Sequence, residues 1–155
     1  MRGLEIVEVP PESDDAQHCL GQYFAELAAR FDVGFDPAKS LSPTHEEFVP
    51  PDGTFIVARL DGAAVGCGGY KRDGADTAYL KRMWVAPGAR GLGLGKRILA
   101  ELEERALAAG YRTVHLETQK SLKEAQNLYH SSGYREVPPF NDEPYAHHWF
   151  EKQLT

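Results

Sequence analysis

The segment from residue 85 to residue 97 constrains the fold of this 155-residue chain more than any other. It reads Val-Ala-Pro-Gly-Ala-Arg-Gly-Leu-Gly-Leu-Gly-Lys-Arg and joins a strand-like run to a strongly periodic helical run. Backbone N–H groups at the start of a helix, together with the helix dipole, form a site for anions. Arg90, Lys96 and Arg97 add full positive charges there. The pattern therefore predicts a strand, a glycine turn and a helix that together bind a phosphate-bearing ligand, such as a diphosphate.

Spacing excludes two other phosphate-binding motifs at this loop. A P-loop that ends at Gly95-Lys96 requires glycine at position 90 and serine or threonine at position 97, but both positions hold arginine. The dinucleotide fingerprint G-x-G-x-x-G needs a third glycine at Lys96 if it begins at Gly91, or at Ile98 if it begins at Gly93. One glycine is usually explained by a tight turn, but three glycines beside cations exceed that need. We therefore favour phosphate binding over a purely structural turn.

The spacing that does fit is R-x-x-G-x-G, formed by Arg90, Gly91, Leu92, Gly93, Leu94 and Gly95. Here the chain resembles the GNAT superfamily of N-acetyltransferases, in which this motif holds the pyrophosphate of coenzyme A. Two further segments extend the resemblance over most of the chain. Residues 80–85 are similar to the fourth strand of the family, and residues 127–129 with 133–134 are similar to its downstream motif.

The resemblance implies both a fold and an activity. The fold would be one mixed α/β (α+β) domain over residues 1–155, with a mostly antiparallel sheet of about seven strands and about four helices. Strands 4 and 5 would splay apart. The activity would be transfer of the acetyl group of acetyl-CoA to a primary amine of a small molecule or amino acid, by direct attack in a ternary complex and without a metal ion.

The resemblance also implies the residues that contact the cosubstrate. The backbone of Met83 and Val85 would pair with the pantetheine arm, and a backbone N–H here would face the thioester oxygen and stabilise the developing oxyanion. The loop residues would hold the diphosphate; these are Arg90, Gly91, Leu92, Gly93, Leu94, Gly95 and Lys96. Downstream, Asn127 and Tyr129 would contact coenzyme A.

Tyr129 matches the family tyrosine that donates a proton to the departing thiolate. The ordinary pKa values of a phenol and a thiol differ by only one or two units, so this transfer is not strongly uphill. The alternative is a helix tyrosine that only packs on the sheet. Because Asn127 precedes it at the matching position, we favour the catalytic role.

The general base is where the chain departs from the family pattern, because Tyr79 stands where many members carry a glutamate. Glu117, near the end of the next strand, is our candidate, and His115 lies on the same strand face as an alternative. A purely structural carboxylate fits Glu117 equally well. His147 and His148 are weaker candidates, since neighbouring strand positions point to opposite faces.

The hydrophobic pattern of the remaining chain predicts a series of alternating elements. Ser13 or Asp14 would cap the first helix, and Asp61-Gly62 would join two strands in a hairpin. The expected strands cover residues 4–9, 54–60, 63–71, 77–85, 113–117, 134–137 and 145–153, and the expected helices cover about 14–31, 43–48, 93–109 and 121–131.

Composition limits the partners and the compartment that we expect. The formal net charge is -6, from 17 Lys and Arg against 23 Asp and Glu, which argues against general nucleic-acid binding. The two cysteines lack metal-ligand spacing, and no apolar run approaches transmembrane length, so we expect a cytoplasmic protein. The family resemblance allows a homodimer.

The acceptor amine is the least defined partner at this level. We expect its site between residues 24–50 and the loop 138–144, where several acids could recognise an ammonium group: Glu26, Glu46, Glu47, Asp142 and Glu143. Two alternatives to a small-molecule enzyme stay open. One is a non-catalytic acetyl-CoA sensor, and the other is a protein or peptide N-acetyltransferase, which would need an open groove.

Overall fold

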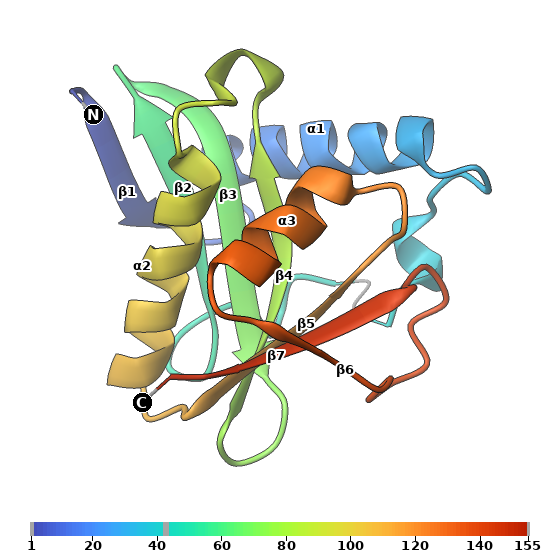
Figure 1. Cartoon of the computed structure of the whole chain (residues 1–155). Coiled ribbons are helices and arrows are strands. Elements are labelled where there is room, and N and C mark those ends of the chain that lie inside the picture. The colour runs from blue at the N-terminus through green and yellow to red at the C-terminus, as the bar shows by residue number, and fades with distance from the viewer. Residues whose placement is uncertain (1, 42–43, 155) are drawn as a thin grey trace.

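The computed structural model describes residues 2–41 and 44–154, which form one seven-stranded sheet with three α-helices (Figure 1). The spatial order of the strands is β1-β2-β3-β4-β5-β7-β6. The strands are β1 (Leu4–Glu8), β2 (Thr54–Leu60), β3 (Ala63–Arg72), β4 (Thr77–Val85), β5 (Thr113–Thr118), β6 (Arg135–Val137) and β7 (His148–Gln153). The helices are α1 (Asp14–Arg30), α2 (Leu94–Ala108) and α3 (Lys123–Ser131), and single 3-10 turns cover Pro37–Lys39 and Pro87–Ala89.

Local sequence signals set the ends of the two long helices. The Ser13 hydroxyl accepts a hydrogen bond from the Ala16 N–H at 3.3 Å, which caps α1 as expected. Helix α2 begins after Gly93 in the left-handed region, with φ of 76°, and Gly110 follows its end with φ of 99°. Both predicted helices are confirmed.

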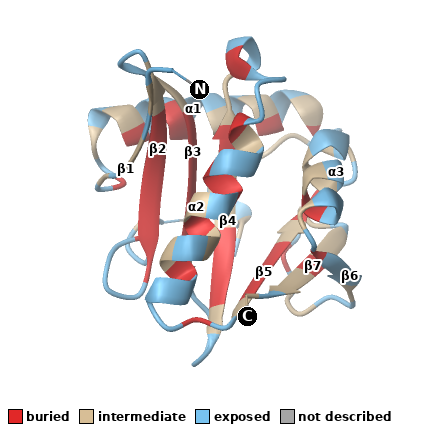
Figure 2. Ribbon diagram, turned by 60° about the vertical axis from the view of Figure 1, so that its left-hand side comes forward, coloured by how far each residue is buried: buried red, intermediate tan, exposed pale blue. Residues whose placement is uncertain are grey.

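The two faces of the sheet are covered by different helices (Figures 1 and 2). Cys19 and Leu20 of α1 pack with a cluster on one face that includes Phe55 and Trp84. On the opposite face, the periodic positions of α2 and part of α3 pack against the sheet, with Ile98 and Leu102 fully buried. Figure 2 shows α2 buried along the side that meets the sheet and exposed along its outer side.

The strands β4 and β5 are parallel neighbours that pair over only part of their length. Their ladder runs from Thr77 opposite Thr113 to Tyr79 opposite His115, although both strands continue beyond it. At this point β4 also has a bulge against β3, where Arg82 adopts a left-handed φ of 65°. The expected splay between strands 4 and 5 is therefore confirmed.

Three expectations need correction. The described residues contain three α-helices instead of about four, and residues 44–48 form turns where a short helix was expected; position 43 lies outside the described residues. A 3-10 turn forms earlier, where the Asp36 side chain accepts from the Ala38 N–H at 3.0 Å. The last strand begins at His148 instead of residue 145, because Tyr145 packs against Phe35.

No helix in the described ranges is long and apolar enough to cross a bilayer.

Glycines in β3 let helix α2 lie close to the sheet. A Cβ atom added at Gly68 would lie 2.9 Å from Leu102 Cδ1 and 3.1 Å from Met83 Cγ. We predict that Gly68→Ala lowers the free energy of unfolding by about 1–3 kcal/mol, because the helix or the strand must move to make room. Urea denaturation measures this change.

The matched control is Gly21→Ala within α1, where an added Cβ would meet no atom within 4 Å. This substitution should stabilise the protein by about 0.5–1 kcal/mol through helix propensity. Equal stability of Gly68→Ala and the wild type would show that the close approach of α2 is not required.

Candidate active site

A large cavity of about 340 Å³ lies beside the end of β4, beyond the part of β4 that pairs with β5. The glycine loop, the end of β4 and helix α3 line most of it. Nine of the residues expected to contact coenzyme A border this cavity: Met83, Val85, Arg90, Gly91, Gly93, Leu94, Gly95, Lys96 and Tyr129. Two others do not border it. Leu92 is 52% exposed on the outer side of the loop, and Asn127 is exposed on α3.

The glycine loop has the geometry of an anion cradle. Gly91 and Gly93 have φ of 85° and 76°, and a Cβ atom at either position would meet no atom within 4 Å. Among the described residues, no side chain caps the start of α2. The first-turn N–H groups of a helix have no partner within the helix, so they are available to a ligand that enters the cavity.

An ion-pair network includes Arg90, Glu26 and Glu124, which line the large cavity. Arg90 donates from Nε to the Val85 carbonyl at 2.9 Å and from Nη2 to Glu26 Oε1 at 2.5 Å. Arg30 contacts Glu26 at 3.3 Å and also pairs with Glu124 of α3, and this pairing holds the pKa of Glu124 below its ordinary value. The motif predicted Arg90 in the glycine loop, but no local pattern indicated that Glu26 would contact it.

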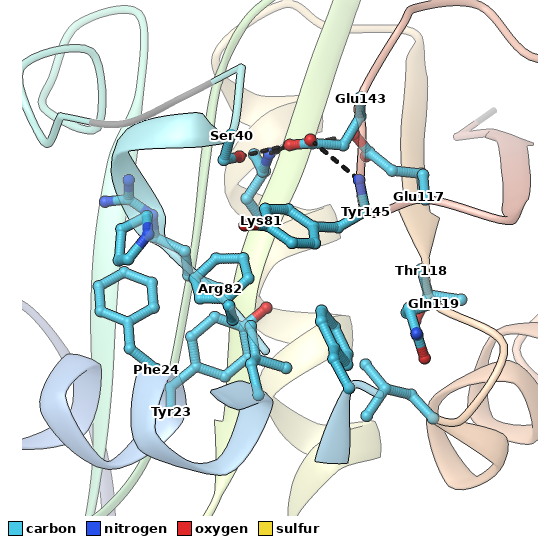
Figure 3. Close-up of a pocket in the computed structure, with 16 residues that line it drawn as sticks. Tyr23, Phe24, Ser40, Lys81, Arg82, Glu117, Thr118, Gln119, Glu143 and Tyr145 are labelled. Carbon is cyan, nitrogen blue, oxygen red and sulfur yellow. Dashed lines mark hydrogen bonds and ion pairs between the residues drawn. The ribbon is translucent and has the colours of Figure 1, made fainter. Parts of the chain in front are cut away.

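A second, smaller cavity of about 80 Å³ adjoins the first (Figure 3). It lies among α1, residues 31–40, residues 143–146 and the splayed ends of β4 and β5. Tyr23, Leu27 and Leu122 line both cavities, so the two are neighbours. The expected acceptor region therefore contains a pocket next to the larger cavity.

Glu117 lines the smaller cavity and is held there by a buried polar network. Its side chain is only 5% exposed. Its Oε1 accepts hydrogen bonds from the Tyr79 hydroxyl and from Asn141 Nδ2 at 3.3 Å, and Lys81 Nζ lies 4.0 Å away. Trp149 Nε1 in turn donates to Asn141 Oδ1 at 2.9 Å. Glu117 Oε2 is buried without a hydrogen-bond partner among the described residues.

Tyr79 contacts the candidate base directly, although the sequence suggested only that the usual glutamate was missing. Its hydroxyl donates to Glu117 and accepts from Asn141 Nδ2 at 3.0 Å. Burial, and then the charge of Glu117, raise the pKa of Tyr79 well above its ordinary value. Tyr79 therefore stays a neutral hydrogen-bond donor and orients the Glu117 carboxylate.

The candidate histidines do not line either cavity in the described part of the chain. His115 pairs with Asp73 at 2.7 Å and stacks on Phe140, because it sits where β4 and β5 are still paired. Glu117 is two residues farther along β5, where the strands have separated. His147 accepts from the Lys120 N–H at 3.2 Å, and His148 contacts Glu136 at 2.8 Å.

Tyr129 lies on the wall of the large cavity, packed against Tyr134 and Phe150 at ring distances of 5.8 and 5.7 Å. Its hydroxyl makes no hydrogen bond to any residue that the structure describes. Burial, and then the charge of Glu117, raise the pKa of this phenol. Tyr23 has a raised pKa for the same main reason and lines both cavities, but its helical spacing indicated only a packing role.

The acids near the expected acceptor region differ in their placement. Glu143 is buried in the smaller cavity and accepts from the Leu41 N–H at 3.2 Å and from Lys81 at 3.4 Å. Glu26 lines the larger cavity, whereas Glu46, Glu47 and Asp142 border neither one in the described ranges. Within those ranges, no group of three His, Cys, Asp or Glu side chains could hold a metal ion.

Comparison with known proteins gives consistent matches. Residues 21–134 match the model of the acetyltransferase (GNAT) family. An uncharacterized N-acetyltransferase of Schizosaccharomyces pombe is 29% identical, covering 91% of this chain and 87% of that protein. A GNAT-family acetyltransferase structure from Staphylococcus aureus has a TM-score of 0.82 at 21% identity, covering 98% and 99% of the two chains. An aminoglycoside 6'-N-acetyltransferase solved with coenzyme A has a TM-score of 0.71 at 18% identity and covers 97% of each.

The glycine loop gives a direct binding prediction. Gly93→Asp should weaken coenzyme A binding about 10²-fold or more in calorimetric titration, because it places a negative charge at the helix start, where phosphate oxygens would lie. Gly93→Asn is the matched control, since asparagine has a similar shape and also tolerates the left-handed region. A smaller loss for asparagine than for aspartate separates charge from strain. Equal affinity of the aspartate variant and the wild type would place the phosphates elsewhere.

Proposed function

Since the chain belongs to the acetyltransferase (GNAT) family and is an acyltransferase, we propose that it moves the acetyl group of acetyl-CoA to a primary amine of a small molecule or amino acid. One observation carries this proposal. Two neighbouring cavities share Tyr23, Leu27 and Leu122 in their walls, with Tyr129 in one cavity and Glu117 in the other. Such an arrangement supports direct attack in a ternary complex, with one partner entering from each side.

The large cavity fits the cosubstrate by its shape and its donors. Acetyl-CoA would supply an acyl thioester and a diphosphate. The glycine loop would hold the diphosphate with backbone N–H groups and Lys96, and the backbone of Met83 and Val85 would face the pantetheine arm. Arg90 would exchange its contact with Glu26 for a phosphate oxygen. The open space at Gly91 and Gly93 supports this fit.

Glu117 is the general base in this proposal. An alkyl ammonium is neutral in only about one molecule in two thousand at pH 7, so the site must remove a proton before attack. Since Oε1 is held by Tyr79, Asn141 and Lys81, the buried Oε2 is the oxygen that accepts the proton. An unpartnered buried carboxylate oxygen is unfavourable in a folded protein, which supports a ligand as its missing partner.

Tyr129 is the general acid in this proposal. As the new N–C bond forms and the C–S bond breaks, the phenol gives its proton to the departing sulfur, and the amine proton goes to Glu117. Burial raises the pKa of Tyr129, which alone would weaken it as an acid. The same burial disfavours a thiolate beside it, so the proton transfer stays close to balanced.

Thiol release tests the reaction and the base together. The wild type should release free thiol from acetyl-CoA only when an amine acceptor is present. Glu117→Gln should lower kcat/KM by about 10²–10⁴-fold, because a neutral amide cannot take the proton. Tight binding of acetyl-CoA without release for any amine, amino acid or peptide would instead indicate the sensor function.

Tyr79→Phe provides a graded control for the same base. It removes one hydrogen bond to the carboxylate but keeps the ring. The value of kcat/KM should fall by less than in Glu117→Gln, because the carboxylate stays in place but loses one donor that orients it. In the Glu117→Gln background, Tyr79→Phe should cause no further loss. An unchanged kcat/KM in the single variant would leave Tyr79 with packing alone.

Tyr129→Phe should keep acetyl-CoA affinity within a few-fold and lower kcat by roughly 10²-fold, as loss of a general acid typically does. For an acyl donor whose thiol leaves as a more stable anion, Tyr129→Phe should lower kcat by less than it does for acetyl-CoA. The raised pKa of Tyr129 also predicts that the wild-type rate does not fall through ionisation of this phenol near pH 10, the ordinary value. Wild-type turnover by the variant, under conditions where chemistry limits, would remove Tyr129 from this role.

A further inference from the structure

We infer that the acceptor is a small primary monoamine with an aryl or compact alkyl group and no second charged group. This inference rests on the proposed function and specifies the acceptor for the smaller cavity. Three features of that cavity carry it: aromatic walls, one buried carboxylate oxygen without a hydrogen-bond partner among the described residues, and a small volume bordered by two tied loops.

The walls opposite the strands are aromatic. The Phe35 ring lies 4.7 Å from Tyr145 and 5.7 Å from Phe24, and the Phe31 ring meets both Phe35 and Tyr145 at 5.8 Å. Phe24, Phe35 and Tyr145 keep part of their surface exposed and line the cavity. Such a surface favours an apolar group, since it offers large faces and few polar atoms.

The charged groups in this cavity leave one position for a ligand donor. Two carboxylates and two cations line it. Glu143 Oε1 accepts from Ser40 Oγ, Leu41 N–H and Lys81 Nζ, while its Oε2 accepts from the Tyr145 N–H at 3.5 Å. Of the four carboxylate oxygens, only Glu117 Oε2 lacks a hydrogen-bond partner among the described residues. One ammonium group would satisfy it.

The sign of the local charge also favours an ammonium over a carboxylate. Lys81 lies between Glu117 at 4.0 Å and Glu143 at 3.4 Å, so these three groups carry one net negative charge. Arg82 also lines the cavity, and its guanidinium contacts His45 Nδ1 at 2.9 Å and lies 4.7 Å from the centre of the Phe48 ring. A carboxylate beside the amine would meet the negative group, which disfavours amino acids.

Two loops that are tied to each other border the cavity on its outer side. The Tyr145 hydroxyl accepts from the Asp36 N–H at 2.9 Å, and Glu143 holds Ser40 and Leu41. The cavity volume of about 80 Å³ suits a compact group. The cavity therefore limits the size of the acceptor as well as its polarity.

Matched amine pairs test this inference with purified enzyme and acetyl-CoA. Benzylamine and 2-phenylglycine differ by one carboxylate, and butylamine and 1,4-diaminobutane differ by one ammonium. We expect kcat/KM for the monoamine to exceed that for its charged partner by at least about tenfold in both pairs. Equal or better use of phenylglycine, diaminobutane or a peptide would overturn the inference.

Substitutions in residues 31–40 test whether the aromatic wall causes the preference for an amine with an apolar group. Phe35→Ala should lower the ratio of kcat/KM for benzylamine to that for methylamine by about tenfold, because it removes a ring that contacts the apolar group. Val33→Ala is the matched control, since Val33 is 78% exposed on the same loop and does not line the cavity. It should leave this ratio unchanged. An unchanged ratio in Phe35→Ala would remove the aromatic wall from acceptor selection.

The panel distinguishes failure of this inference from failure of the proposed function. Thiol release with a different preferred amine class would overturn only the acceptor class. Absence of release with every amine, while acetyl-CoA still binds, would overturn the proposed function itself.

Discussion

The loss of pairing between β4 and β5 is the constraint on which the rest of the structure depends. The strands share a ladder only as far as Tyr79 and His115, and the bulge at Arg82 turns β4 away beyond that point. A non-glycine residue in the left-handed region costs about 1–2 kcal/mol. Arg82 offsets this cost because its guanidinium hydrogen-bonds to the Thr44 carbonyl at 3.1 Å and packs over Phe48. The strained residue therefore also anchors residues 44–48 on the sheet.

This divergence decides which side chains can meet a substrate. His115 and Glu117 share one face of β5, but the first lies in the paired part and the second in the separated part. The residue at the usual base position, Tyr79, lies at the last paired position and reaches Glu117 with its hydroxyl. The carboxylate of the proposed mechanism thus lies one strand away from its common position, and the tyrosine supports it.

Elements set by local signals could be predicted from the sequence. The Asp61-Gly62 hairpin has positive φ at both residues, as its turn type requires, and the strand, glycine loop and α2 follow the predicted order. The network around Glu117 could not be predicted, since Tyr79 and Asn141 lie 38 and 24 residues away in the chain. Strand parity placed His115 beside Glu117 correctly but could not show where the pairing of β4 and β5 ends. The contact of Glu26 with Arg90 likewise joins elements that are distant in sequence.

The walls of the smaller cavity come from different chain segments than the glycine loop does. Residues 31–40 and 143–146 border its outer side, and the second of these segments lies outside the region that matches the family model. Neither segment belongs to a strand of the sheet or contributes to the glycine loop. Substitutions in these two segments can therefore change the substrate range and leave the sheet and the glycine loop intact. Both natural evolution and enzyme engineering can use this separation.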